Sequence, residues 1–261
     1  GSLSLLTEDY SVLAANLNIA SASITGSFRL QQNGFPSDMA FGSVKGQNAL
    51  FVISTWAPSS SIVQGIIQAY TTDGQMLGRW TIPHIVAGIA YDPDKQVVYI
   101  TAADSHEIYS FSPQSSDMPR YFAEVTGARR LGAITIDPQR QQLYVADVDS
   151  GSIFALDASR HASAITHVGT PQALLIDPGG PQLLVADGAG RRILAIDLRT
   201  QPPPPPRAWN TGKALRSPTG LAWYEPNRLI VADEAAGAVS LIDSTQGLLY
   251  TTPLVSNKAA K

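Results

Sequence analysis

The chain has 261 residues, of which 44% are hydrophobic and only 15% are charged, and its formal net charge at pH 7 is −3. This length suits one large all-β domain or two small ones. The weakly negative charge gives no basic surface for nucleic acid, which is therefore not an expected partner. The absence of cysteine excludes disulfides, thiolate metal sites and cysteine nucleophiles.

Three features of the sequence bear on its compartment. No run of about 18 apolar residues occurs, so we expect no membrane-spanning segment in this chain. Gly1-Ser2 is typical of a vector-derived remnant, and a signal peptide or anchor can have preceded it. Low charge, many Ser and Thr residues and no Cys favour a secreted or periplasmic, extracytoplasmic location.

The first 34 residues are the least regular part of the chain. Thr7-Glu8-Asp9-Tyr10 suits the start of a short helix that reaches Leu17, because Thr followed by acidic residues is a helix-start signal. A strand over residues 10–15 is the alternative. Residues 23–31 favour a strand, which Gln32-Asn33-Gly34 ends.

From Phe35 onward, a unit of four strands repeats five times. In three units the first strand runs into Asp-Pro, and these pairs end a strand because proline cannot donate to the ladder. We predict first strands at 39–41, 89–91, 134–136, 174–176 and 221–223, and second strands at 50–54, 97–101, 143–146, 183–186 and 229–232. Third strands are predicted at 66–70, 108–111, 153–156, 193–196 and 239–242, and fourth strands at 77–82, 120–125, 164–168, 207–210 and 248–254.

The spacing of the units predicts the architecture. The equivalent positions Ala40, Ala90, Thr135, Leu175 and Ala222 are 50, 45, 40 and 47 residues apart. Four strands at such a spacing are typical of propeller blades. We expect one domain over residues 1–261, an all-β, six-bladed β-propeller of four-stranded antiparallel blades. Five repeats are clear, and both termini are expected to meet in the sixth blade. Five or seven blades are the alternatives.

The segment Gln201 to Arg207 contains five consecutive prolines. Such a run adopts polyproline II and cannot pair as a central strand. We expect a rigid surface loop between the third and fourth strands of its unit. A ligand for a proline-binding groove is the alternative.

Several motifs resemble NHL repeats. Second strands end in Val145-Ala146-Asp147, Val185-Ala186-Asp187 and Val231-Ala232-Asp233, and Pro218-Thr219-Gly220-Leu221-Ala222 opens the last unit. With Arg192 in a turn, residues 35–243 resemble NHL repeats and, more loosely, the six-bladed SMP-30/gluconolactonase-like propellers. The second unit departs from this pattern, because Asp104 lies two places late relative to its apolar strand. The first unit has Ser54 in place of the acid and an insert from Trp56 to Gly65. The resemblance implies a fold shared by lyases, lactonases, sensors and adaptor surfaces.

The recurring acids favour a structural interpretation. Asp147, Asp187 and Asp233 occupy one place in their units, where a carboxylate can accept backbone N–H bonds of a turn. A metal or general-base role for one of them is the alternative. The gluconolactonase-like enzymes hold a divalent metal in the central channel through Glu, Asn and Asp, and that resemblance makes Asp38 a weak candidate ligand. No cofactor is predicted, and a divalent metal in the channel is a minor alternative.

Candidate ligand contacts lie in loops that a propeller places on one face. His84 and His106 have no HxH or HExxH spacing, so they do not predict a zinc site. Arg129 and Arg130 precede an inner strand, where a guanidinium can hold a carboxylate or phosphate. Aromatic and arginine side chains together favour recognition. The candidates are Trp56, His84, Asp104, His106, Arg129, Arg130 and Arg192. Solvated turn residues, with one arginine pairing with a turn acid, are the alternative.

The sequence favours binding over catalysis. No G-x-S-x-G elbow, P-loop or G-x-G-x-x-G occurs, and no catalytic cluster interrupts the repeats. We expect an extracytoplasmic binding or interaction module that recognises a ligand or protein partner on the loop-bearing face and channel mouth. The alternatives are a metal-dependent hydrolase or lyase of the gluconolactonase-like kind, and a metal-free small-molecule enzyme that uses the central channel.

Overall fold

The structure is a computed structural model that describes residues 2–6, 11–18, 21–30, 34–59, 62–209, 211 and 215–253, with side chains from Arg29 onward. Within these ranges the chain is all-β, and its one helical element is the 3-10 turn η1 (Glu234–Ala236). No helix in this part of the chain is long and apolar enough to cross a membrane.

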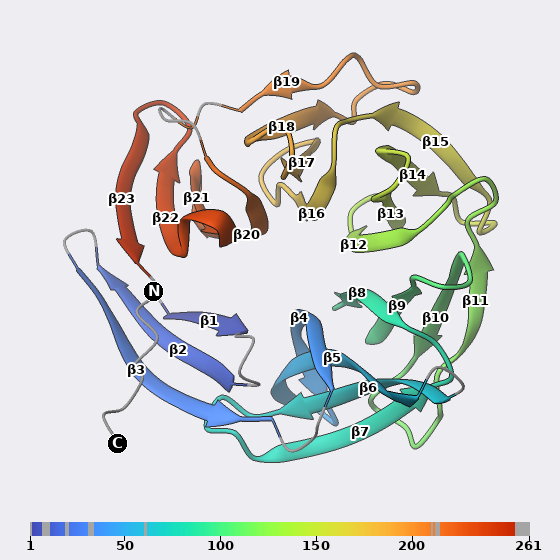
Figure 1. Ribbon diagram of the computed structural model, residues 1–261. Helices are drawn as coiled ribbons and strands as arrows, with labels where there is room; N and C mark the ends of the chain where they lie inside the picture. Colours follow the sequence, from blue (N-terminus) through green and yellow to red (C-terminus); the bar gives the residue numbers. More distant parts are fainter. Residues whose placement is uncertain are drawn as a thin grey trace.

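Five four-stranded antiparallel sheets follow one another around a central axis as the blades of a propeller (Figure 1). From the axis outward, blade 1 contains β4 (Phe35–Val44), β5 (Gln47–Ser59), β6 (Ile62–Tyr70) and β7 (Met76–Ile82), and blade 2 contains β8 (Val86–Asp92), β9 (Val97–Ala102), β10 (Glu107–Phe111) and β11 (Arg120–Glu124). Blade 3 contains β12 (Leu131–Asp137), β13 (Gln142–Asp147), β14 (Ser152–Leu156) and β15 (Ala162–His167). Blade 4 contains β16 (Pro171–Ile176), β17 (Gln182–Asp187), β18 (Arg192–Asp197) and β19 (Arg207–Ala208), and blade 5 contains β20 (Pro218–Glu225), β21 (Arg228–Asp233), β22 (Ala238–Asp243) and β23 (Gly247–Pro253).

The prediction of six four-stranded blades is wrong, because the described residues form five. A three-stranded sheet of β1 (Ser2–Leu6), β2 (Ser11–Asn18) and β3 (Ser21–Arg29) lies between blade 5 and blade 1 (Figure 1). Residues 254–261, which were expected to meet the N-terminal residues in one blade, lie outside the described residues, so that part stays a prediction. The last described strand, β23, pairs with β22 and completes blade 5, so it is not available to the N-terminal sheet.

The N-terminal alternatives resolve in favour of strands. β2 pairs with β1 on one side and with β3 on the other, so residues 11–18 form a strand and not a helix. The predicted helix start at residues 7–10, the strand ends at 31, 210 and 254, and the turn residues 32 and 33 lie outside the described residues.

The repeated strands form where the apolar pattern predicts them. In blade 3, β13 is one residue longer than predicted at each end, and β14 begins one residue earlier than predicted. The side chains from Leu143 to Ala146 are buried on both faces of the sheet. Both faces are covered because each blade packs between two others. The core therefore consists of layers between blades, such as the layer of Phe51, Trp80 and Phe111 between blades 1 and 2.

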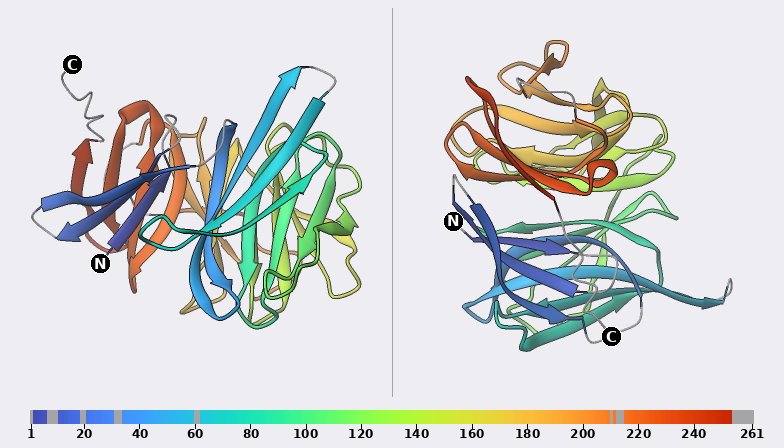
Figure 2. Two further views of the ribbon diagram at one scale, coloured as in Figure 1. Left: turned by 90° about the horizontal axis from the view of Figure 1, so that it is seen from below. Right: turned by 60° about the vertical axis from the view of Figure 1, so that its left-hand side comes forward.

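Two segments interrupt the regular repeat, the insert of the first unit and the proline-rich segment. The insert at Trp56 to Gly65 is an extension of the β5–β6 hairpin, which rises beyond the neighbouring strands (Figure 2). The proline-rich segment links the third and fourth strands of blade 4 as predicted. The fourth strand of blade 4, β19, has only two residues, because the prolines before it have no N–H groups to donate to β18.

Candidate functional site: the loop-bearing face and the central channel

Two kinds of connection meet on one face of the propeller. Because the strands of a blade alternate in direction, the turn between the second and third strands lies on the same face as the connection that enters the first strand. We call this the loop-bearing face. It contains the β5–β6, β9–β10, β13–β14, β17–β18 and β21–β22 turns and the connections that precede β8, β12, β16 and β20.

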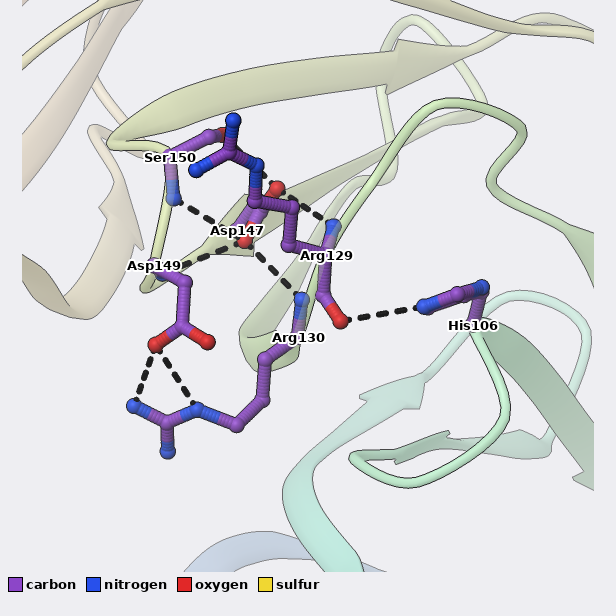
Figure 3. Close-up of polar contacts among 6 residues, drawn as sticks. All are labelled: His106, Arg129, Arg130, Asp147, Asp149 and Ser150. Carbon is purple, nitrogen blue, oxygen red and sulfur yellow. Dashed lines mark hydrogen bonds and ion pairs between the residues drawn. The ribbon is translucent and has the colours of Figure 1, made fainter.

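In blade 3, one carboxylate accepts hydrogen bonds from both kinds of connection (Figure 3). Asp147, at the end of β13, accepts the backbone N–H groups of Arg129 at 2.7 Å and Arg130 at 3.1 Å. It also accepts the N–H groups of Asp149 at 3.1 Å and Ser150 at 3.3 Å and the Ser150 hydroxyl at 2.7 Å. Burial raises the pKa of the Asp147 carboxyl, but these hydrogen bonds outweigh burial and the pKa falls below its ordinary value.

Blade 4 repeats this arrangement and adds an arginine. Asp187 accepts the N–H groups of Thr170 at 2.9 Å and Gly190 at 3.0 Å, and Arg192 Nε donates to it at 3.0 Å. Burial raises the pKa of the Asp187 carboxyl, yet these donors lower it overall. Arg192 is therefore the arginine that pairs with a turn acid, and its guanidinium is already engaged.

Blade 5 uses Asp233 in the same way. Its carboxylate accepts the N–H groups of Arg216 at 2.7 Å, Ser217 at 2.8 Å and Ala236 at 3.2 Å. The first two donors precede β20, and the third belongs to the turn after β21. The repeated acids hold turns, as the repeat pattern predicts.

The candidate residues of blades 2 and 3 come together at one boundary (Figure 3). The His106 Nε2 atom lies 3.0 Å from the Arg129 carbonyl oxygen and joins the β9–β10 turn to the loop before β12. Arg130 Nε and Nη2 donate to one oxygen of Asp149 at 2.9 and 2.7 Å. The hydrogen bond to Asp149 raises the pKa of the Arg130 guanidinium. This ion pair is about half exposed on both sides and can be rearranged by a partner.

A second polar network surrounds His84 in the connection that precedes β8. His84 Nδ1 lies 3.2 Å from an Asp104 carboxylate oxygen, and His84 Nε2 lies 2.9 Å from the Tyr109 hydroxyl. The Tyr109 hydroxyl also donates to Glu107 at 2.8 Å, and Ser105 Oγ donates to the same Glu107 oxygen at 3.2 Å. Burial, with the hydrogen bond to Glu107, raises the pKa of Tyr109 to about 12, so the hydroxyl stays protonated.

The sequence indicated His84 and Asp104 as separate candidates for ligand contact, but not their mutual contact and not Glu107 or Tyr109. The two missed residues are two apart on β10, and alternate residues of a strand point to the same side. That spacing, next to the displaced Asp104, is the signal that was available.

Trp56 lies apart from both networks, on the extended β5–β6 hairpin. Its side chain is 38% exposed, and Ile62 on the facing strand is 52% exposed. Trp56 is paired with Gln64, and Ile62 is two residues from Gln64, so both apolar side chains lie on the same face of the hairpin. Both side chains thus remain uncovered on this hairpin.

The inner strands of all five blades enclose a channel of about 510 Å³. Most of the side chains that line it are apolar, among them Met39, Ile89, Leu174 and Leu221. Asp38 on β4 is the only carboxylate in the lining that the described side chains form.

The surroundings of Asp38 differ from those of the turn acids. One carboxylate oxygen accepts the N–H of Met39 at 2.8 Å, and the other accepts the N–H of Ile89 on β8 at 3.0 Å. Burial among the inner strands raises the pKa of Asp38 from 3.8 to about 6, and the two backbone bonds oppose this only in part. The Asp38 side chain is half-buried, so the channel leaves part of it accessible.

Among the described residues, no three His, Cys, Asp or Glu side chains are grouped so that they could hold a metal ion. Asp38 therefore does not belong to a group of three or more such side chains within that part of the chain. The expectation about metals and cofactors stays a prediction.

Comparison with known proteins shows the fold. A chain in the crystal structure of a nidogen/laminin complex is similar with a TM-score of 0.76 and 17% sequence identity, over 97% of this chain and 94% of that one. A protein of unknown function from Bacteroides caccae is similar with a TM-score of 0.68 and 13% identity, over 93% of this chain and 89% of that one. No family model matches the sequence, and no curated protein matches it. The chain is a β-propeller of four-stranded antiparallel blades by its own topology and by these likenesses.

Proposed function

We propose that the protein is an extracytoplasmic interaction module whose partner is a protein that docks on the loop-bearing face against the β5–β6 hairpin. The observation that carries this proposal is the exposed Trp56 and Ile62 pair on that hairpin. Tryptophan is enriched among the residues that contribute most to protein–protein binding. The extracytoplasmic location and the NHL-like character of the repeats belong to this proposal and rest on composition and motifs.

The base of the hairpin adds a polar border to these apolar side chains. The connection that precedes β8 packs on it, since the Val86 N–H donates to Thr55 Oγ1 at 3.1 Å. A side chain at Gly65 would lie only 2.8 Å from the His84 carbonyl oxygen, so the two segments are in close contact. The His84 and Asp104 network therefore adjoins the hairpin. An apolar centre with a polar border is the usual composition of a protein–protein interface.

The similar chain from the nidogen/laminin complex supports a protein partner, because that chain comes from a complex between proteins. The likeness concerns the fold, so it supports the class of function and not the identity of the partner.

Site-specific photo-crosslinking tests the proposal. A benzoylphenylalanine at position 56 is expected to crosslink a partner protein in an extract of the source cells. The same group at position 118 is the control, because Met118 is 51% exposed on the opposite face, between β10 and β11. The partner would then be purified, and its affinity for the unmodified protein measured by calorimetry.

A double substitution, Trp56→Ala with Ile62→Ser, should weaken binding of that purified partner at least tenfold, about 1.4 kcal/mol. Met118→Ala should leave the affinity unchanged. Crosslinking that is equal at both positions, an unchanged affinity of the double variant, or a crosslink only to a second copy of this chain would each contradict the proposal.

A further inference from the structure

Asp38 breaks the repeat at a position where the other blades have small residues. With Ala40, Ala90, Thr135, Leu175 and Ala222 as equivalents, the residues two places earlier are Asp38, Gly88, Ala133, Ala173 and Gly220. The strand register agrees, since Asp38, Ala173 and Gly220 are paired with Ile53, Ala186 and Ala232 of their second strands. The architecture of a blade therefore does not require a carboxylate here.

The Asp38 carboxylate has spare capacity for hydrogen bonding. Its two oxygens carry about four acceptor positions, and backbone N–H groups occupy two of them. By contrast, Asp147 accepts five hydrogen bonds. No Lys, Arg or His of the described chain forms an ion pair with Asp38, and no cation contributes to its raised pKa. A half-buried carboxylate without a counter-ion is stabilised when a cation approaches it.

The space beside Asp38 suits a small organic molecule. A volume of about 510 Å³ falls in the range of roughly 300–1,000 Å³ that is usual for ligand pockets. The lining offers apolar contacts and a few neutral polar groups, including Thr135, Gln172 and Thr219. Small residues at the equivalent positions of blades 3 to 5 keep the channel wall open at the level of the carboxylate.

The donor set argues for an ammonium group over a metal ion. Calcium prefers six to eight oxygen ligands, several of them carboxylates, whereas the described side chains contribute one carboxylate to this channel. An ammonium group needs one carboxylate and a few neutral acceptors, and an apolar body attached to it would contact the remaining wall.

We propose that the central channel binds a small organic amine, with its ammonium group on the Asp38 carboxylate and its apolar body among the inner strands. This site is independent of the hairpin surface, because Asp38 lies on the channel wall between β4 and β8.

Calorimetry at pH 7.5 with matched probe pairs tests this proposal. The probes are hexylamine, cyclohexylmethylamine and 2-phenylethylamine, each compared with the alcohol of the same carbon skeleton and, for the last, with 3-phenylpropanoate. At least one amine is expected to bind once per chain and at least tenfold more tightly than its alcohol. The propanoate is expected not to bind. If no amine binds more tightly than its alcohol, the proposal is wrong.

Two variants identify the site. Asp38→Asn should weaken the amine at least tenfold and leave the alcohol unchanged, whereas Asp94→Asn, an exposed acid in the β8–β9 turn, should change neither. Ala173→Phe should weaken both ligands because it fills the channel, and its thermal unfolding is checked first. An Asp38→Asn variant that keeps the affinity for the amine would overturn the assignment.

The pH dependence gives a further readout. The amine should bind about tenfold more weakly at pH 5 than at pH 7.5, because a carboxyl group of pKa about 6 is mostly neutral at pH 5. The other ionisable residue of the described lining is Tyr91, whose hydroxyl is bonded to Ser43 at 2.7 Å. Equal affinity at both pH values would contradict the role of Asp38. A failed partner search at the hairpin leaves these results unaffected.

Discussion

The acids of blades 3 to 5 and the acid of blade 1 show how the same side chain serves different purposes in one propeller. Asp147 lies at the end of a second strand, where five donors converge on it and hold its pKa below the ordinary value. Asp38 lies on a first strand with two donors, and burial raises its pKa to about 6. The number of donors relative to burial therefore separates a structural carboxylate from one that can accept a ligand.

The largest effect is expected from removing a repeated acid. Asp147→Ala leaves the N–H groups of Arg129 and Arg130 without their acceptor, so it should lower the free energy of unfolding by about 4 kcal/mol. Urea denaturation followed by circular dichroism measures this change. Asp94→Asn, with an exposed side chain, is the control and should change the free energy by less than about 0.5 kcal/mol. A loss below about 1 kcal/mol for Asp147→Ala would show that the turn does not depend on this carboxylate.

A smaller effect, with a pH dependence of its own, is expected at Asp38. Because its pKa is raised in the folded protein, its contribution to stability is fully present below pH 3.8 and is lost as the pH rises through about 6. Relative to Asp38→Asn, the unsubstituted protein should therefore lose roughly 2–3 kcal/mol between pH 4 and pH 7. Paired urea titrations at these pH values measure the difference. The lowered pKa values of Asp147 and Asp187 have the opposite sign, since their contributions are lost only as the pH falls below 3.8. A gain in the stability of the unsubstituted protein relative to Asp38→Asn with rising pH would exclude the raised pKa.

The smallest effect separates two arginines of the loop-bearing face. Arg192 donates to the fully buried Asp187, so Arg192→Ala should cost about 1 kcal/mol. Arg130 pairs with the exposed Asp149, so Arg130→Ala should cost less than about 0.5 kcal/mol. Thermal unfolding of the two variants under the same conditions compares them. Equal losses would mean that the burial of the partner acid does not decide the strength of these pairs.

The sequence predicts the blades well because each strand carries its own signal. The apolar runs at residues 143–146 and 183–186 predict strands that are buried on both faces, and the structure has them there. The number of blades could not be derived in the same way. The N-terminal residues do not repeat the four-strand pattern, so their sequence does not indicate how many strands their sheet contains.

The candidate site was predicted in part. The prediction that His84 and His106 lie in loops of one face agrees with the topology, but their partners depend on which loops approach each other across blades. Tyr109 reaches His84 over 25 positions of sequence, and no local pattern gives that distance. Asp38 was predicted only as a weak candidate metal ligand. Its departure from the repeat is a clearer sequence signal, because the equivalent residues of the other blades are all small, namely Gly88, Ala133, Ala173 and Gly220.

The contrast between Asp38 and Asp147 can be measured directly by NMR titration of the aspartate side-chain carboxyl carbons, with Asp38→Asn and Asp147→Asn used to assign the two signals. The carboxyl group of Asp38 is expected to titrate near pH 6, and that of Asp147 below pH 3.8. Titration of Asp38 at or below pH 4 would contradict the claim that blade 1 holds a partly desolvated carboxylate with capacity for a ligand.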